Sequence, residues 1–332
     1  MTVGDARLDS RWSVEKANRW YEKQPWIVGC NFIPSTAINQ LEMWQGDTFD
    51  LPTIDRELGY AQGIGMNSVR VFLHDLAWEQ DQKGFKSRVT EFLKVADKHK
   101  IKTMFVLFDS CWDPEPHVGK QRAPRVGVHN GGWVQCPGAK SEKDPSTWPK
   151  LKEYAYDMVH SFRRDPRVLM WDVYNEPRKE ALPLLKEAFQ WVRSASPSQP
   201  VTSAPFGGDE AVSAFQLESS DVTTCHNYGP ANELSAYLDK LAVGGRPIVC
   251  SEWMARTAGS TVKGNLHVFK DRHVGCMNWG LVAGKTETMY PWGSKEGTPE
   301  PAIWFHDLFR ADGTPFDPAE VALFRELTQR GG

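Results

Sequence analysis

The feature that most constrains the fold of this chain is a regular alternation of short apolar runs with amphipathic segments. Each apolar run is rich in β-branched and aromatic residues and is bounded by turn-forming or charged residues, a pattern typical of a buried strand. The eight predicted strands are Trp26–Phe32, Asn67–Leu73, Lys102–Phe108, Val168–Tyr174, Val201–Ala204, Val222–His226, Ile248–Ser251 and Gly275–Trp279.

The segments between these runs have the period of helices; Val89, Phe92, Leu93 and Ala96, for example, fall on one helical face. A chain that alternates strand and helix builds a parallel sheet with right-handed crossovers. Eight such units in about 300 residues predict that residues 1–332 form a single α/β domain, a closed (β/α)8 TIM barrel. A doubly wound open sheet is the alternative, but the first strand is not followed by a Gly-rich phosphate turn.

Two long segments interrupt this rhythm. Residues 109–149, after the third predicted strand, are rich in Gly, Pro, Trp and His, and residues 281–301, after the eighth, carry Tyr290 and Trp292. Loops of this length are uncommon in compact domains unless they serve a function or are disordered. Both follow strands, so we expect them on the C-terminal face of the barrel, where barrel enzymes hold their active sites.

Composition excludes several classes of partner. The net charge is −3 and no dense Lys/Arg cluster occurs, so we expect neither nucleic acid nor a membrane surface as a partner. No run approaches the ~20 apolar residues of a membrane span. Four of the six cysteines fall in strand-like runs, which predicts free thiols and no disulfide framework.

The N-terminal segment, Met1 to Arg11, is polar and charged and has no apolar stretch of signal-peptide length. With the free thiols, this predicts a cytoplasmic protein. A secreted protein whose leader had been removed would look the same apart from its cysteines. The sequence leaves the oligomeric state open.

Two glutamates end predicted strands four and seven, in the segments WDVYNEP (171–177) and VCSEW (249–253). The carboxyl ends of barrel strands converge, so Glu176 and Glu252 are expected to face each other across a cleft. Such a pair suits cleavage of a glycosidic bond, which needs one acid and one nucleophile or base. The alternative interpretation is that each glutamate caps the helix that follows it.

These motifs resemble glycoside hydrolase family five and its relatives in clan A, from strand one to strand eight. The resemblance implies a (β/α)8 barrel with retaining chemistry, in which Asn175 precedes the acid/base Glu176 and Glu252 is the nucleophile. By the same resemblance Arg70 supports the nucleophile, His226 contacts substrate or acid, Tyr228 orients the nucleophile, and Trp279 forms the floor under the cleaved sugar.

Physical reasoning agrees with these implied roles. An arginine is always charged, so Arg70 would keep Glu252 ionised and nucleophilic. Glu176 must be protonated for the first step, so burial and the charge of Glu252 should raise its pKa. The competing interpretations are a structural ion pair for Arg70, a core histidine for His226 and ordinary core packing for Trp279.

One departure from the family pattern concerns the end of strand three, where many members have a histidine. This chain has FDSCW at 108–112, so Asp109 or Trp112 would have to contact the sugar. The segments NEPR (175–178) and TCHNY (224–228) resemble the mannanase branch instead.

Other chemistries fit less well. His117 and His129, in the loop after strand three, match no common metal-ligand spacing, so we expect no metal and no cofactor. The predicted substrate is a β-linked gluco-, manno- or xylo-configured oligo- or polysaccharide, with endo or exo action left open. A transglycosylase using the same residues is one alternative. A non-catalytic carbohydrate-binding barrel is another, but neither carboxylate nor Arg70 has been lost.

Overall fold

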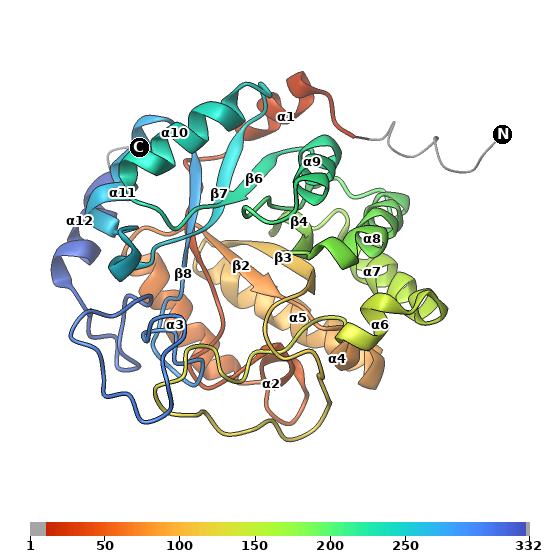
Figure 1. Cartoon of the computed structure of the whole chain (residues 1–332), viewed down its shortest axis with the longest axis horizontal. Helices are drawn as coiled ribbons and strands as arrows, with labels where there is room; N and C mark the ends of the chain where they lie inside the picture. The colour runs from red at the N-terminus through yellow and green to blue at the C-terminus, as the bar shows by residue number, and fades with distance from the viewer. Residues whose placement is uncertain (1–10, 330–332) are drawn as a thin grey trace.

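The computed structural model describes residues 11–329, so nearly all of the N-terminal segment discussed above lies outside the described residues. Its centre is one eight-stranded parallel sheet in the order β5-β4-β3-β2-β1-β8-β7-β6, surrounded by helices (Figure 1). This confirms the predicted (β/α)8 barrel. The strands are β1 Val28–Asn31, β2 Ser68–Phe72, β3 Lys102–Asp109, β4 Val168–Asn175, β5 Val201–Thr202, β6 Thr223–His226, β7 Ile248–Trp253 and β8 Gly275–Trp279.

Every predicted strand overlaps an observed one, but three strands extend further toward the C-terminal face. β3 ends at Asp109 and β4 at Asn175, and these two residues are register partners whose side chains are hydrogen-bonded to each other. β7 continues to Trp253, which places Glu252 inside the strand instead of after it. Polar residues thus remain in the sheet where they find partners across it.

The seam between β5 and β6 is closed without a regular ladder. β5 has only two residues, too few for continuous strand pairing. Instead the Thr202 hydroxyl donates to the Val222 carbonyl at 2.9 Å and lies 2.7 Å from the Thr224 hydroxyl. The backbone N–H of His226 also donates to the Pro205 carbonyl at 3.1 Å. Side-chain and loop hydrogen bonds therefore complete the barrel.

The outer helices bury one face each against the strands. In α5 the residues Phe85, Val89, Phe92, Leu93 and Ala96 are buried, which extends the predicted face by one residue. The α-helices are α1 Val14–Tyr21, α2 Gln40–Trp44, α3 Leu51–Gly63, α4 Asp75–Gln80, α5 Gln82–Lys98, α6 Ala139–Lys143, α7 Trp148–Phe162, α8 Leu182–Ser194, α9 Glu210–Ser219, α10 Ala231–Ala242, α11 Val262–Asp271 and α12 Pro318–Gln329.

The interior of the barrel has an apolar layer and a polar layer. The apolar cluster joins Tyr21 of α1 to side chains in the strands or directly before them, namely Ile27, Met104, Leu169, Met170, Val222, Val249 and Met277. Further along the strands, toward their carboxyl ends, the interior side chains are polar or charged, with Arg70 fully buried among them. Charged groups buried to this degree need partners, and those partners make up the site described below.

The six cysteines are free, five of them buried, which confirms the prediction of no disulfide framework. The cytoplasmic location inferred from them stays a prediction. Among residues 11–329, no helix has the length and apolar character that crossing a bilayer requires.

The long segments after β3 and β8 lie side by side on the C-terminal face, as the yellow and dark blue loops of Figure 1 show. The Asn130 N–H donates to the Thr286 carbonyl at 2.8 Å, and the Gly297 N–H donates to the Val126 carbonyl at 2.9 Å. The first segment is shorter than predicted because it includes α6, a 3-10 turn at Pro145–Thr147 and the start of α7. The second extends beyond residue 301, as far as α12.

Arg256, after β7, holds the second segment in place. Its guanidinium donates to the carbonyls of Trp304, His306 and Asp307 at 3.0, 2.7 and 2.8 Å. It also forms a buried ion pair with Glu320 of α12, at 2.6 Å. One side chain therefore joins β7, the segment after β8 and the last helix.

We expect Arg256→Ala to lower the free energy of unfolding by about 3–5 kcal/mol, because it leaves Glu320 buried without its partner. Urea unfolding followed by circular dichroism measures this loss. Lys94→Ala, which removes a solvent-exposed ion pair with Glu91, is the control and should cost about 0–1 kcal/mol. Equal losses in the two variants would contradict the role assigned to Arg256.

Candidate active site

Arg70 of β2 lies at the centre of the polar layer, and each of its five N–H donors has an acceptor. Its Nε and Nη2 donate to Asp172 Oδ2 at 3.0 and 2.8 Å. Its Nη1 donates to Asn31 Oδ1 at 2.8 Å and to Glu252 Oε1 at 2.6 Å. Its Nη2 also donates to Asn175 Oδ1 at 2.7 Å. Although burial lowers the pKa of Arg70, the charges of Asp172 and Glu252 raise it overall, so the guanidinium stays charged.

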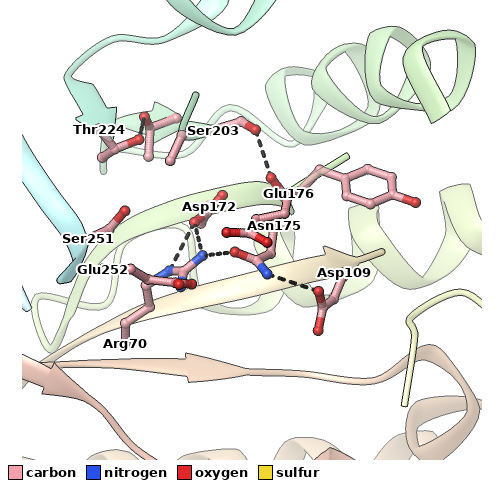
Figure 2. Close-up of polar contacts among 12 residues, drawn as sticks. Arg70, Asp109, Asp172, Asn175, Glu176, Ser203, Thr224, Ser251 and Glu252 are labelled. Atoms are coloured by element: carbon pink, nitrogen blue, oxygen red, sulfur yellow. Dashed lines mark hydrogen bonds and ion pairs between the residues drawn. The ribbon is translucent and has the colours of Figure 1, made fainter. Parts of the chain in front are cut away.

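A second set of contacts extends from Arg70 through Asn175 to Asp109 (Figure 2). The Asn175 amide donates to Asp109 Oδ1 at 2.9 Å, while the other carboxylate oxygen accepts from Trp133 Nε1 at 2.7 Å. Asp109 is 1% exposed, and burial raises its pKa to about 6. The sequence offered Asp109 as a sugar contact, but the structure places it behind Asn175, where it bonds that amide and does not line the cavity.

The two glutamates at the ends of β4 and β7 face each other. One carboxylate oxygen of Glu176, one of Glu252 and a ring nitrogen of His226 lie within 4.8 Å of one another. Glu252 Oε2 accepts from the Tyr228 hydroxyl at 2.8 Å, and Glu176 Oε1 lies 2.9 Å from His226 Nδ1. Glu176 has a φ of +45°, a conformation that is uncommon outside glycine and that often marks functional sites.

The two carboxyl groups differ in their surroundings. Burial raises the pKa of both Glu176 and Glu252. For Glu252 the neighbouring His226 ring, the Arg70 charge and the Tyr228 hydroxyl oppose this rise, while the charge of Glu176 adds to it. For Glu176 the Cys111 thiol and the more distant charge of Arg70 oppose the rise, but only Glu252 is bonded to Arg70 directly. Glu176 has no cation bonded to it, because burial lowers the pKa of His226 to about 4 and leaves the imidazole neutral near pH 7. Of the two groups, Glu176 is therefore the better proton carrier and Glu252 the better anion.

Within residues 11–329, two groups of side chains have the residue types of a metal site. One is Glu176, His226 and Glu252, where the Arg70 guanidinium already holds a Glu252 oxygen and would repel a second cation. The other is the buried cluster of His74, Asp75 and Cys136. In that cluster the His74 ring bonds the Gln135 carbonyl and the Leu76 N–H, and so caps α4.

A cavity of about 360 Å³ opens above the two glutamates. Arg70, His226 and Asp109 do not line it, whereas the other predicted site residues do. Trp112 and Trp292 are each 46% exposed. The lining residues are Ser110, Cys111, Trp112, His129, Asn130, Trp133, Asn175, Glu176, Arg178, Phe206, Tyr228, Glu252, Trp279, Trp292 and His306.

Some lining residues were not expected to belong to the site. His306 lies beyond the predicted loop, and Asn130 and Phe206 stand in no recognisable motif. His129, in contrast, belongs to the loop that the sequence places on the C-terminal face, where it was also weighed as a metal ligand. Phe206 follows β5, whereas the positions of the other residues depend on how the segments after β3 and β8 fold against each other, which no local pattern encodes.

The sequence model described as "Cellulase (glycosyl hydrolase family 5)" matches residues 44–284. No curated protein matches the sequence significantly.

Solved structures similar to this chain include three carbohydrate-active proteins. The GH5_18 protein of Streptomyces cattleya, solved with GlcNAc, has a TM-score of 0.61 and 14% identity, over 92% of this chain and 80% of its own. The endo-β-1,4-mannanase of Thermotoga petrophila has a TM-score of 0.58 and 15% identity, over 93% of this chain and 77% of its own. The exo-β-1,4-mannosidase of Opitutaceae bacterium strain TAV5 has a TM-score of 0.62 and 16% identity, over 92% of this chain and 60% of its own. At identities this low, the similarity to these structures shows a shared fold and nothing further.

A further buried acid, Asp307, lies next to the turn that follows Trp279. Gly280 there has a φ of +77°, and a Cβ on it would lie 2.3 Å from Asp307 Oδ1. The Thr288 hydroxyl donates to Asp307 Oδ2 at 2.8 Å. Burial raises the pKa of Asp307 to about 7.

Because the folded pKa of Asp307 lies above the unfolded value of about 3.9, its ionisation destabilises the fold as pH rises from about 4 to 7. Asp307→Asn removes this titration. We therefore expect the difference in the free energy of unfolding, variant minus wild type, to increase by up to about 4 kcal/mol as pH rises from about 4 to 7. Urea titrations at several pH values measure the difference.

The exposed Asp312→Asn is the matched control, and its difference from the wild type should not grow between pH 4 and 7. Parallel stability curves for Asp307→Asn and the wild type would show that Asp307 does not titrate in this range.

Proposed function

This chain belongs to glycosyl hydrolase family 5, and from that premise we propose that it is a retaining β-glycosidase. In this proposal Glu252 is the nucleophile and Glu176 is the acid/base. The observation that carries it is the approach of the two carboxylates, whose nearest oxygens lie within 4.8 Å. Retaining enzymes separate the pair by ~5–5.5 Å, whereas inverting enzymes need ~6.5–9.5 Å to admit a water molecule between them.

The first half of the reaction uses the difference between the two groups. Glu252, ionised beside Arg70, attacks the anomeric carbon, and the bond from that carbon to the leaving oxygen breaks. Glu176 gives its proton to the leaving oxygen at the same time. The products are a glycosyl ester of Glu252, the released alcohol and an ionised Glu176.

The second half reverses these roles. Glu176 takes a proton from a water molecule, and the resulting hydroxyl attacks the anomeric carbon. The ester bond breaks, Glu252 returns to its carboxylate, and Glu176 is protonated again. When a sugar hydroxyl replaces water in this step, the same residues carry out transglycosylation.

His226 contacts both carboxylates and fits a positioning role. A neutral imidazole has one N–H, so only one of its nitrogens donates at a time. While Glu176 is protonated, Nδ1 accepts that proton's hydrogen bond at 2.9 Å. The ring proton then lies on Nε2, 3.6 Å from Glu252 Oε1. This arrangement favours the protonated Glu176 and ionised Glu252 of the resting enzyme.

We further propose exo action, in which the enzyme removes a sugar from the non-reducing end. Trp279 and Tyr228, on the nucleophile side, mark where the cleaved sugar lies. On that side the segments after β3 and β8 are hydrogen-bonded together, which supports a cavity closed at one end. A closed end leaves no path for a chain that continues beyond the cleaved sugar.

The preferred sugar in this proposal is β-linked mannose. Its support comes from the NEPR and TCHNY segments and from similarity to proteins described as β-1,4-mannosidase and mannanase. The gluco- and xylo-configured substrates are the alternatives, and a screen of aryl β-glycosides separates the three.

The mechanism predicts that Glu252→Ala and Glu176→Ala each lose at least about 10³-fold in kcat on an aryl β-glycoside, because each lacks a group that acts on reacting atoms. Azide should restore turnover to Glu252→Ala and give a glycosyl azide of inverted anomeric configuration. Glu57→Gln, which changes a buried glutamate that does not line the cavity, is the control. Wild-type turnover in either alanine variant would exclude the mechanism.

Exo action predicts that a defined β-1,4-linked mannohexaose yields monosaccharide and the pentasaccharide first, as chromatography of early time points will measure. The physical reason is that only the chain end fits the closed side of the cavity. Early accumulation of di-, tri- and tetrasaccharides together would mean endo action.

A further inference from the structure

Two histidines that the mechanism does not use meet in the wall of the cavity. His129 comes from the segment after β3 and His306 from the segment after β8, and their ring centroids lie 5.3 Å apart. Both line the cavity, although only 5% and 1% of their surfaces are exposed. The His306 ring also contacts those of Tyr228 and Trp279, so the pair borders the place proposed for the cleaved sugar.

The protonation of both rings follows from their backbone contacts. His129 Nδ1 lies 2.7 Å from the Tyr290 carbonyl, and His306 Nδ1 is hydrogen-bonded to the Met254 carbonyl. A carbonyl only accepts, so each Nδ1 carries the proton. Burial lowers the pKa of His129 to about 4 and that of His306 well below its usual value. Both rings are therefore neutral near pH 7.

Each ring consequently presents Nε2 as an acceptor. Among residues 11–329, neither Nε2 is hydrogen-bonded to the protein. Neither Nε2 is among the unpartnered polar atoms that are shut off from solvent, so both are accessible to solvent. Because both side chains line the cavity, their solvent-accessible acceptors face it.

We propose that His129 and His306 form a subsite that accepts hydrogen bonds from two hydroxyl groups of the sugar being cleaved. This inference rests on the proposed function and extends it to substrate selection. A free hydroxyl donates a hydrogen bond, whereas the one oxygen through which an internal sugar carries the next sugar is an ether and cannot donate. An ether or O-methyl group there leaves a buried acceptor unpaired, which is costly. The subsite therefore selects an unsubstituted terminal sugar by chemistry as well as by shape.

The first experiment uses the wild-type enzyme. Its substrates are an aryl β-glycoside of the preferred sugar and the deoxy and O-methyl derivatives at each hydroxyl other than that at C2. Sites built to bind a hydroxyl reject analogues without it by ~10⁴-fold or more. We expect kcat/KM to fall at least about 100-fold at two of these positions. A fall below about 10-fold at every position would overturn the subsite.

The second experiment tests the two histidines directly. His129→Phe and His306→Phe keep an aromatic ring and remove the acceptor, so each should lose activity on the parent glycoside. For each variant, kcat/KM on the matching deoxy substrate should be little lower than on the parent glycoside, because the substitution and the deoxy analogue remove the same hydrogen bond. His267→Phe, at an exposed position on α11, is the control. If each variant retains the full wild-type penalty for every deoxy substrate, the rings only pack and the proposal is wrong.

A binding measurement separates this inference from the proposed function. Titration of the wild-type protein with the free monosaccharide should shift the ¹⁵N resonances of both Nε2 atoms as they accept hydrogen bonds. Shifts without turnover of any aryl β-glycoside would refute the proposed function and support the subsite. Turnover without shifts, and with equal rates on the deoxy series, would support the function and refute the subsite.

Discussion

The structure of the site depends on one buried cation, Arg70. A charge without solvent is costly unless its hydrogen bonds are all made, and each Arg70 donor here has its acceptor. Those acceptors come from β1, β4 and β7, so a single side chain sets the relative positions of three strand ends. Removing any acceptor would leave a donor unpaired, which makes the arrangement specific to one geometry.

Arg70 also makes the two glutamates unequal. It bonds to Glu252 and, on its other side, to Asn175, the residue before Glu176. Glu252 therefore lies beside a fixed positive charge, while the carboxyl of Glu176 faces a neutral imidazole. Two carboxyl groups in one cavity can then hold opposite protonation states, which is the condition for acid and nucleophile chemistry at a single pH.

The segments after β3 and β8 form a wall of the cavity that the barrel strands do not provide. Arg256 fixes the second segment to β7 and α12, and backbone hydrogen bonds fix the first segment to the second. The result is an aromatic wall in which His129 and His306 are held by their Nδ1 atoms and present their other nitrogens to the cavity. Reaction type and substrate selection thus come from different parts of the molecule, the strand ends and the loops.

The barrel and the positions of Glu176 and Glu252 could be predicted from the sequence because both depend on local patterns. Strand and helix periods are set by neighbours within a few residues, and barrel strands bring their carboxyl ends to one face. The place of Asp109 behind Asn175 could not be predicted, because it depends on the register of β3 against β4. The pairing of His129 with His306 joins residues that are far apart in the chain. The sequence by itself thus determined the fold and the two facing glutamates, and only the tertiary structure decided which other side chains line the cavity, because contacts between distant segments set side-chain direction and burial.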